Sequence, residues 1–116
     1  MRVVLVDLEG TKGLVAKDTV AGGYGSRLRP FSRVTRIFSG VKRRINDLPS
    51  IHLGYVAALL ARAGHEVVWT REDEMVEGDA AIVLSSLVDY RHEAAWADRM
   101  RAVGVRVGFV GLAASK

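Results

Sequence analysis

Short apolar runs along the chain alternate with segments in which apolar residues recur at helical spacing. The runs are rich in Val, Ile and Leu and occupy residues 2–7, 66–70, 79–84 and 105–110. Runs of this length with almost no polar interruption are typical of strands that are buried on both faces of a parallel sheet. The pattern therefore predicts four strands.

Two helices are predicted between these strands. After Ser50, a good N-cap residue, apolar residues repeat every three or four positions as far as Gly64, which is suited to a C-cap. A second amphipathic helix is predicted over residues 90–103, and Gly104 ends it. Its apolar positions are taken to be Ala94, Ala95, Met100 and Val103.

Residues 8–49 show no sustained period and contain many glycines. A structureless stretch of this length is unusual in a compact domain and is usually functional or disordered. Residues 31–45 could form a short helix, because several apolar residues recur there at helical spacing.

Strands that alternate with helices predict an α/β fold. We expect a Rossmann-like three-layer domain, with a parallel sheet of about four to five strands and helices on both faces, formed by residues 1–116 as a single domain. The ligand crevice of such sheets lies at the carboxyl ends of the strands. Three connections rich in glycine or serine leave those ends, after Leu8, at Ser85 and at Gly111.

Composition excludes several classes of chemistry. The sequence has no cysteine, which excludes disulfides, thiolate zinc sites and cysteine-held iron–sulfur clusters in this chain. No apolar run approaches the ~20 residues of a membrane span. We expect a cytoplasmic protein that makes no membrane contact.

Charge is distributed unevenly. Seven basic residues and no acid lie between Asp18 and Asp47, so the rest of the chain is net acidic although the total is +4. Such a segment can meet phosphates, pair with acids of a partner domain, or be solvated. No known nucleic-acid-binding pattern accompanies it. Because seven like charges repel one another unless acids oppose them, we predict that the stretch from Arg27 to Arg44 docks a partner domain.

The candidate chemistry is that of binding. The hydroxyls of Ser85 and Ser86 can donate to a ligand, or one of them can cap the following helix. The histidines stand in no recognisable triad or metal-ligand spacing, and Asp7 and Glu9 form no assignable acid–base pair. We assign no catalytic and no metal-ligating residue.

The order of these turns resembles the cobalamin-binding N-terminal domain of cobalamin-dependent radical S-adenosylmethionine (radical SAM) enzymes. Three features carry the resemblance, which spans nearly the whole chain. They are Lys17-Asp18-Thr19 followed by Gly22-Gly23-Tyr24-Gly25, the helix and turn over residues 53–67 that end in Gly64-His65-Glu66-Val67, and the S-x-L of Ser85-Ser86-Leu87 with a glycine turn at Gly111.

The resemblance implies a protein that binds cobalamin as the cofactor module of a methyltransferase-type enzyme. The D-x-H-x-x-G motif that supplies a lower cobalt ligand in other cobalamin domains is absent, which implies base-off cobalamin without a histidine ligand. The cofactor-binding residues implied are Thr11, Lys12, Gly22, Gly23, Tyr24, Gly25, Ser85, Ser86, Leu87, Gly111 and Leu112. Here Leu112 stands where the family often has a second glycine.

The resemblance also implies a partner. The iron–sulfur (4Fe-4S) cluster and S-adenosylmethionine would belong to a downstream radical SAM domain of the same polypeptide, so we expect this chain to be the N-terminal fragment of a longer protein and not to be catalytic alone. Two other interpretations stay open: the nucleotide-sugar-binding half of a glycosyltransferase-like protein, and a basic Rossmann-like module for nucleic acid or protein.

Overall fold

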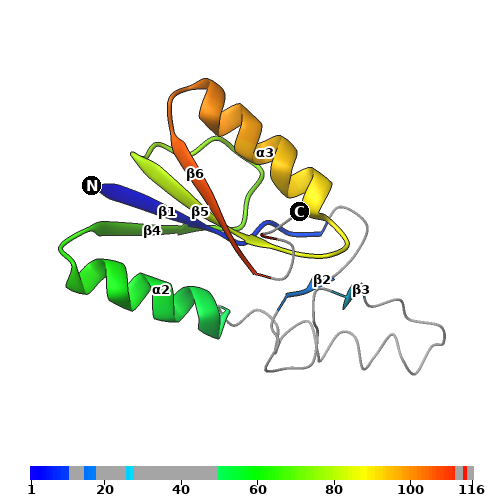
Figure 1. The fold of residues 1–116 in the computed structure, drawn as a ribbon, viewed down its shortest axis with the longest axis horizontal. Coiled ribbons are helices and arrows are strands. Elements are labelled where there is room, and N and C mark those ends of the chain that lie inside the picture. The colour runs from blue at the N-terminus through cyan, green and yellow to red at the C-terminus, as the bar shows by residue number, and fades with distance from the viewer. Residues whose placement is uncertain (11–14, 18–25, 28–49, 112–113, 115–116) are drawn as a thin grey trace.

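The strands and helices fall where the apolar runs and the helical periods predict them. The computed structural model describes residues 1–10, 15–17, 26–27, 50–111 and 114 (Figure 1). Its elements are β1 (Arg2–Val6), β2 (Val15–Ala16), β3 (Ser26–Arg27), α2 (Ile51–Arg62), β4 (Glu66–Thr70), β5 (Ala80–Ser85), α3 (Tyr90–Ala102) and β6 (Arg106–Gly111).

The main sheet has four strands in the order β4-β1-β5-β6, and every neighbouring pair is parallel. Helix α2 lies on one face and α3 on the other (Figure 1). The predicted α/β class, the Rossmann-like arrangement and the helices on both faces are therefore confirmed. A separate pair of very short strands, β2 and β3, was not predicted.

The sheet order places a switch point between β1 and β5. From β1 the chain returns through α2 to β4 on one side, whereas from β5 it returns through α3 to β6 on the other side. The connections therefore diverge at the carboxyl ends of β1 and β5. In open parallel sheets this is where a crevice forms.

The face under α3 holds most of the core. Trp96, Ala97 and Met100 of the helix pack against Val4, Val6, Leu8, Ala81, Val83 and Val105, and all of these are buried. The buried positions of α3 correct our prediction for this helix. Ala95 and Val103 are exposed and Ala94 is only half-buried, so Met100 alone of the four predicted positions is buried.

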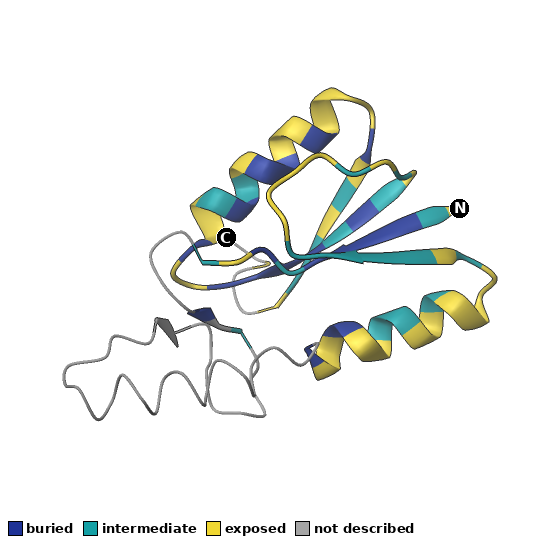
Figure 2. Cartoon of the chain, turned by 180° about the vertical axis from the view of Figure 1, so that it is seen from behind, coloured by how far each residue is buried: buried dark blue, intermediate teal, exposed yellow. Residues whose placement is uncertain are grey.

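The face under α2 is packed more thinly. Only Leu5, Leu53 and Leu84 are fully buried there, and the other apolar side chains of this cluster are half-buried. Much of the surface of α2 is exposed (Figure 2), and its exposed residues include three large apolar side chains, those of Ile51, Tyr55 and Leu59. The two faces of the sheet are thus unequally covered by the described residues.

The ends of the helices agree with the predicted boundaries, with one difference in detail. Gly64 and Gly104 follow the two helices with φ of 82° and 91°, the left-handed conformation that favours glycine. Ser50 is the N-cap of α2, but its side chain makes no capping hydrogen bond. The helix predicted over residues 31–45 lies outside the described residues, as does nearly all of the basic stretch.

Candidate functional site

The predicted site residues that the structure describes all lie at the carboxyl edge of the sheet. Ser85 ends β5, Ser86 and Leu87 follow it, and Gly111 ends β6 in register with Ser85. The other predicted positions are outside the described residues: Thr11, Lys12, Gly22, Gly23, Tyr24, Gly25 and Leu112. The structure therefore brings together four of the eleven predicted residues and does not describe the other seven.

The ends of β5 and β6 approach each other closely. The Ser85 hydroxyl donates to the Val110 carbonyl over 3.3 Å. Gly111 has a φ of 117°, and a Cβ on it would lie 2.7 Å from the Ser85 carbonyl oxygen. Both the backbone conformation and the nearby Ser85 carbonyl exclude a side chain at Gly111. No side chain therefore projects from the end of β6, and we call the ends of β5 and β6 at Ser85 and Gly111 the flat edge.

Ser86 organises the turn into α3 rather than facing a ligand. It is fully buried, its backbone N–H donates to Glu93 Oε2 over 2.8 Å, and its hydroxyl donates to Glu93 Oε1 over 3.0 Å. The same hydroxyl accepts the Asp89 backbone N–H over 3.1 Å. The alternative prediction, that a serine is the N-cap of this helix, is therefore wrong. Asp89 is the N-cap residue, and Ser86 stabilises the turn that precedes it.

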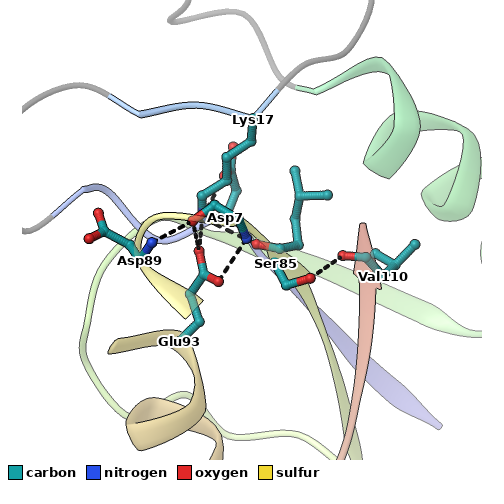
Figure 3. Close-up of polar contacts among 8 residues, drawn as sticks. Asp7, Lys17, Ser85, Asp89, Glu93 and Val110 are labelled. Atoms are coloured by element: carbon teal, nitrogen blue, oxygen red, sulfur yellow. Dashed lines mark hydrogen bonds and ion pairs between the residues drawn. The ribbon is translucent and has the colours of Figure 1, made fainter. Parts of the chain in front are cut away.

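A buried lysine completes this cluster (Figure 3). Lys17, just after β2, places its ammonium 2.9 Å from Glu93 Oε1 and 3.4 Å from Asp7 Oδ1, and it donates to the Leu84 carbonyl over 3.2 Å. The side chain of Lys17 is 5% exposed and that of Glu93 is 1% exposed. A charge so far from water requires such partners, and Lys17 has three acceptors within reach.

We define the end cluster as Asp7, Lys17, Ser86 and Glu93. Its contacts connect the end of β1, the end of β5, the segment after β2 and the first turn of α3. The cluster lies at the switch point, and its member Glu93 comes from α3. A ligand at this edge would therefore meet Asp7, with the buried Lys17 beside it, rather than an open gap between β1 and β5.

The sheet face beside α2 is more open. Ile82 and Val110, on β5 and β6, are half-buried there, and Gly108 between them in the sheet is exposed. A Cβ added to Gly108 would meet nothing within 4 Å. We call Ile82, Gly108 and Val110 the open face. Ile82 and Val110 lie at the margin of the cluster that includes Leu53 of α2, and among the described residues they are only half-buried.

The rim beyond the edge is apolar. Leu87, Val88 and Tyr90 are all exposed, although each is large and hydrophobic. They come soon after the buried Ser85, which ends β5, and the buried Ser86. The edge thus combines backbone carbonyls, a carboxylate and apolar side chains, a mixture that suits an organic ligand with both apolar and polar groups.

Sequence reasoning missed Glu93 and assigned no role to Lys17. The signal for Glu93 was present, because it precedes Trp96, Ala97 and Met100 by three, four and seven positions and so shares their buried face. A carboxylate in such a series indicates a buried cation. Nothing in the pattern around Lys17 identifies it as that cation.

The other titratable groups in the part of the chain that the structure describes form no second site. His92 lies 3.8 Å from Asp73, which also pairs with Arg99 at the surface. Among the described residues, no group of three or more His, Asp or Glu side chains could hold a metal ion, and no helix is long and apolar enough to cross a membrane.

Comparison with known proteins adds no assignment. No protein-family model matches the sequence, and no match is found among curated proteins or solved structures.

Proposed function

We propose that this chain binds cobalamin, base-off and with no histidine lower ligand, as the cofactor module of a cytoplasmic radical SAM methyltransferase-type enzyme. The proposal starts from the resemblance of residues 17–25, 53–67 and 85–87 to that family. The observation that carries it further is the open face, which runs beside α2 up to the flat edge at Ser85 and Gly111.

The open face suits the nucleotide tail of cobalamin. The tail is a long narrow group that ends in a planar base, and it needs a slot between a sheet and a helix. Gly108 leaves space above β6, while the half-buried Ile82 and Val110 offer apolar contact. Filling this slot would remove from water an apolar surface that the described residues cover only in part, which favours binding.

The edge suits the passage from the tail to the macrocycle. Gly111 lies against the Ser85 carbonyl and so keeps the ends of β5 and β6 close together, and Ser85 keeps acceptor capacity on its hydroxyl after donating to Val110. Beyond them the exposed Leu87 offers an apolar contact to the macrocycle. The cofactor would supply the transferable methyl group, and this chain would position it for a downstream radical SAM domain.

The test is a binding experiment with hydroxocobalamin. After incubation and gel filtration, the protein fraction should carry the cobalamin spectrum, and substitution of His52, His65 and His92 should leave that spectrum unchanged. A colourless protein fraction at micromolar cofactor overturns the proposal.

A glycine substitution tests the position of the tail. Gly108→Phe should fold, because its Cβ meets no atom within 4 Å, but the ring would occupy the open face. Cobalamin binding should fall at least tenfold while the melting temperature stays unchanged. Ala95→Phe, on the exposed surface of α3, is the matched control and should bind normally. Equal binding by both variants would contradict a tail on the open face.

A further inference from the structure

We propose that Asp7 is a specificity-determining residue of this site: its carboxylate accepts a hydrogen bond from a neutral N–H donor, a primary amide, and disfavours an anionic group at the same place. This inference rests on the proposed function, since it assigns one contact within that site. It is carried by the position of Asp7, its unused acceptor capacity and the charge around it.

The position of Asp7 follows from the strand. Its backbone N–H donates to the Thr70 carbonyl over 3.0 Å, so the ladder between β1 and β4 continues past Val6. Alternation along a strand then places Asp7 on the same face as Leu5, which packs under α2. Asp7 therefore lies at the carboxyl end of the face that also contains the open face.

The acceptor capacity of Asp7 is largely unused by the described residues. An ionised carboxylate offers about four lone-pair sites. Glu93 uses both of its oxygens for Ser86 and Lys17 and is buried. Asp7 has one ion pair within the described residues, to Lys17 at 3.4 Å, and its side chain is 17% exposed. Asp7 is thus the member of the end cluster that a ligand can reach.

The charge of the end cluster determines which ligand group is favoured there. Two carboxylates share one ammonium, and Lys17 lies nearer to Glu93 than to Asp7. Among the described residues, the negative charge that Lys17 does not balance therefore lies at Asp7, where it attracts N–H donors and repels anions, more strongly than in bulk water because the site is partly buried. A corrin ring carries neutral primary amides around its edge, whereas a nucleoside diphosphate would bring negative charge.

The experiment compares cyanocobalamin with its monocarboxylic acid derivatives, in each of which one side-chain amide is hydrolysed to a carboxylate. Each is titrated against the wild-type chain, Asp7→Asn, and Glu9→Gln as a matched control at an exposed carboxylate two residues away. At least one monoacid should bind the wild-type chain about tenfold or more weakly than cyanocobalamin does. Asp7→Asn should abolish that penalty, because asparagine can donate to the carboxylate, and Glu9→Gln should retain it.

The outcomes separate this inference from the proposed function. If cyanocobalamin binds but every monoacid binds equally well, or if the penalty survives in Asp7→Asn, the role of Asp7 is wrong and cobalamin binding still stands. If cyanocobalamin binds to none of the three proteins, both proposals are wrong. Melting temperatures of the variants verify folding, since Lys17 keeps its contacts with Glu93 and Leu84 when Asp7 is neutral.

Discussion

At the scale of single residues, Glu93 is a charged side chain that is held in place by buried polar contacts. Its carboxylate is buried and accepts from the Ser86 backbone, the Ser86 hydroxyl and Lys17. It lies within the first turn of α3, where the positive end of the helix dipole also favours a negative charge. Glu93 is therefore a structural residue whose loss would leave a buried cation without its nearest partner.

We expect Glu93→Ala to destabilise the fold by about 3–5 kcal/mol, because removal of one member of a buried ion pair leaves the other uncompensated. Glu93→Gln should cost less, since its amide oxygen can still accept from Ser86. Urea unfolding measures both, with Glu72→Gln at an exposed site as the control. A loss below about 1 kcal/mol for Glu93→Ala would show that Lys17 does not depend on this carboxylate.

Two glycines should respond oppositely to alanine. Gly111→Ala should destabilise the protein by at least about 1–3 kcal/mol, because its φ is in the left-handed region and its Cβ would lie 2.7 Å from the Ser85 carbonyl oxygen. Gly54→Ala, inside α2 and with nothing within 4 Å, should stabilise it by about 0.5–1 kcal/mol. Thermal unfolding of the pair measures both effects, and equal shifts would contradict the conformation given for Gly111.

Residue roles at the edge could be predicted only in part from the sequence. Ser85 and Gly111 were recognisable because they follow apolar strands, and parallel strands end at one edge. Ser86 was assigned to the ligand, yet it is buried against Glu93. That contact depends on how α3 is rotated about its axis, and two of the four apolar positions that we chose for that helix, Ala95 and Val103, are exposed.

At the scale of elements, the two helices differ in how firmly they are held. Helix α3 buries Trp96, Ala97 and Met100, and the Trp96 ring nitrogen donates to the Glu74 carbonyl over 3.1 Å. Helix α2 buries only Leu53. Both helices could be predicted from the sequence, because their apolar residues repeat at helical spacing over several turns. It missed β2 and β3, because strands of two residues carry no period.

Leu53 should therefore determine whether α2 stays docked. Leu53→Ala is expected to cost about 2–5 kcal/mol, the usual range for a buried leucine. Leu59→Ala, at an exposed position of the same helix, should change stability by less than about 0.5 kcal/mol. Hydrogen exchange should also show α2 opening at a lower free energy than α3. Faster exchange in α3 than in α2 would contradict the packing described for the two faces.

At the scale of the whole molecule, the strand order β4-β1-β5-β6 determines where a ligand can bind. The alternation of strands and helices predicted a parallel sheet with helices on both faces, but the order of the strands was not predicted. The sequence could not predict that the two faces are unequally covered, because that depends on where α2 lies across the sheet. The open face is the result of that placement.

The unequal covering gives a prediction for ligand choice. Cobinamide, a corrinoid without the nucleotide tail, should bind at least tenfold more weakly than cobalamin, because it leaves the open face exposed to water. In Gly108→Phe this preference should disappear, since the ring blocks the place of the tail. Spectral titration of both corrinoids measures the preference. Equal affinity of the wild-type chain for cobinamide and cobalamin would contradict a tail bound on the open face.

The end cluster also has a consequence for the order of folding. Lys17 and the carbonyl that it meets on Leu84 are 67 positions apart in the chain, and Glu93 lies further still. Bringing together residues so far apart in the chain costs conformational entropy. Favourable contacts offset this cost only after β1 and β5 have paired. We therefore expect these contacts to be made after the rate-limiting step, so that Glu93→Gln accelerates unfolding and leaves the refolding rate nearly unchanged in stopped-flow measurements.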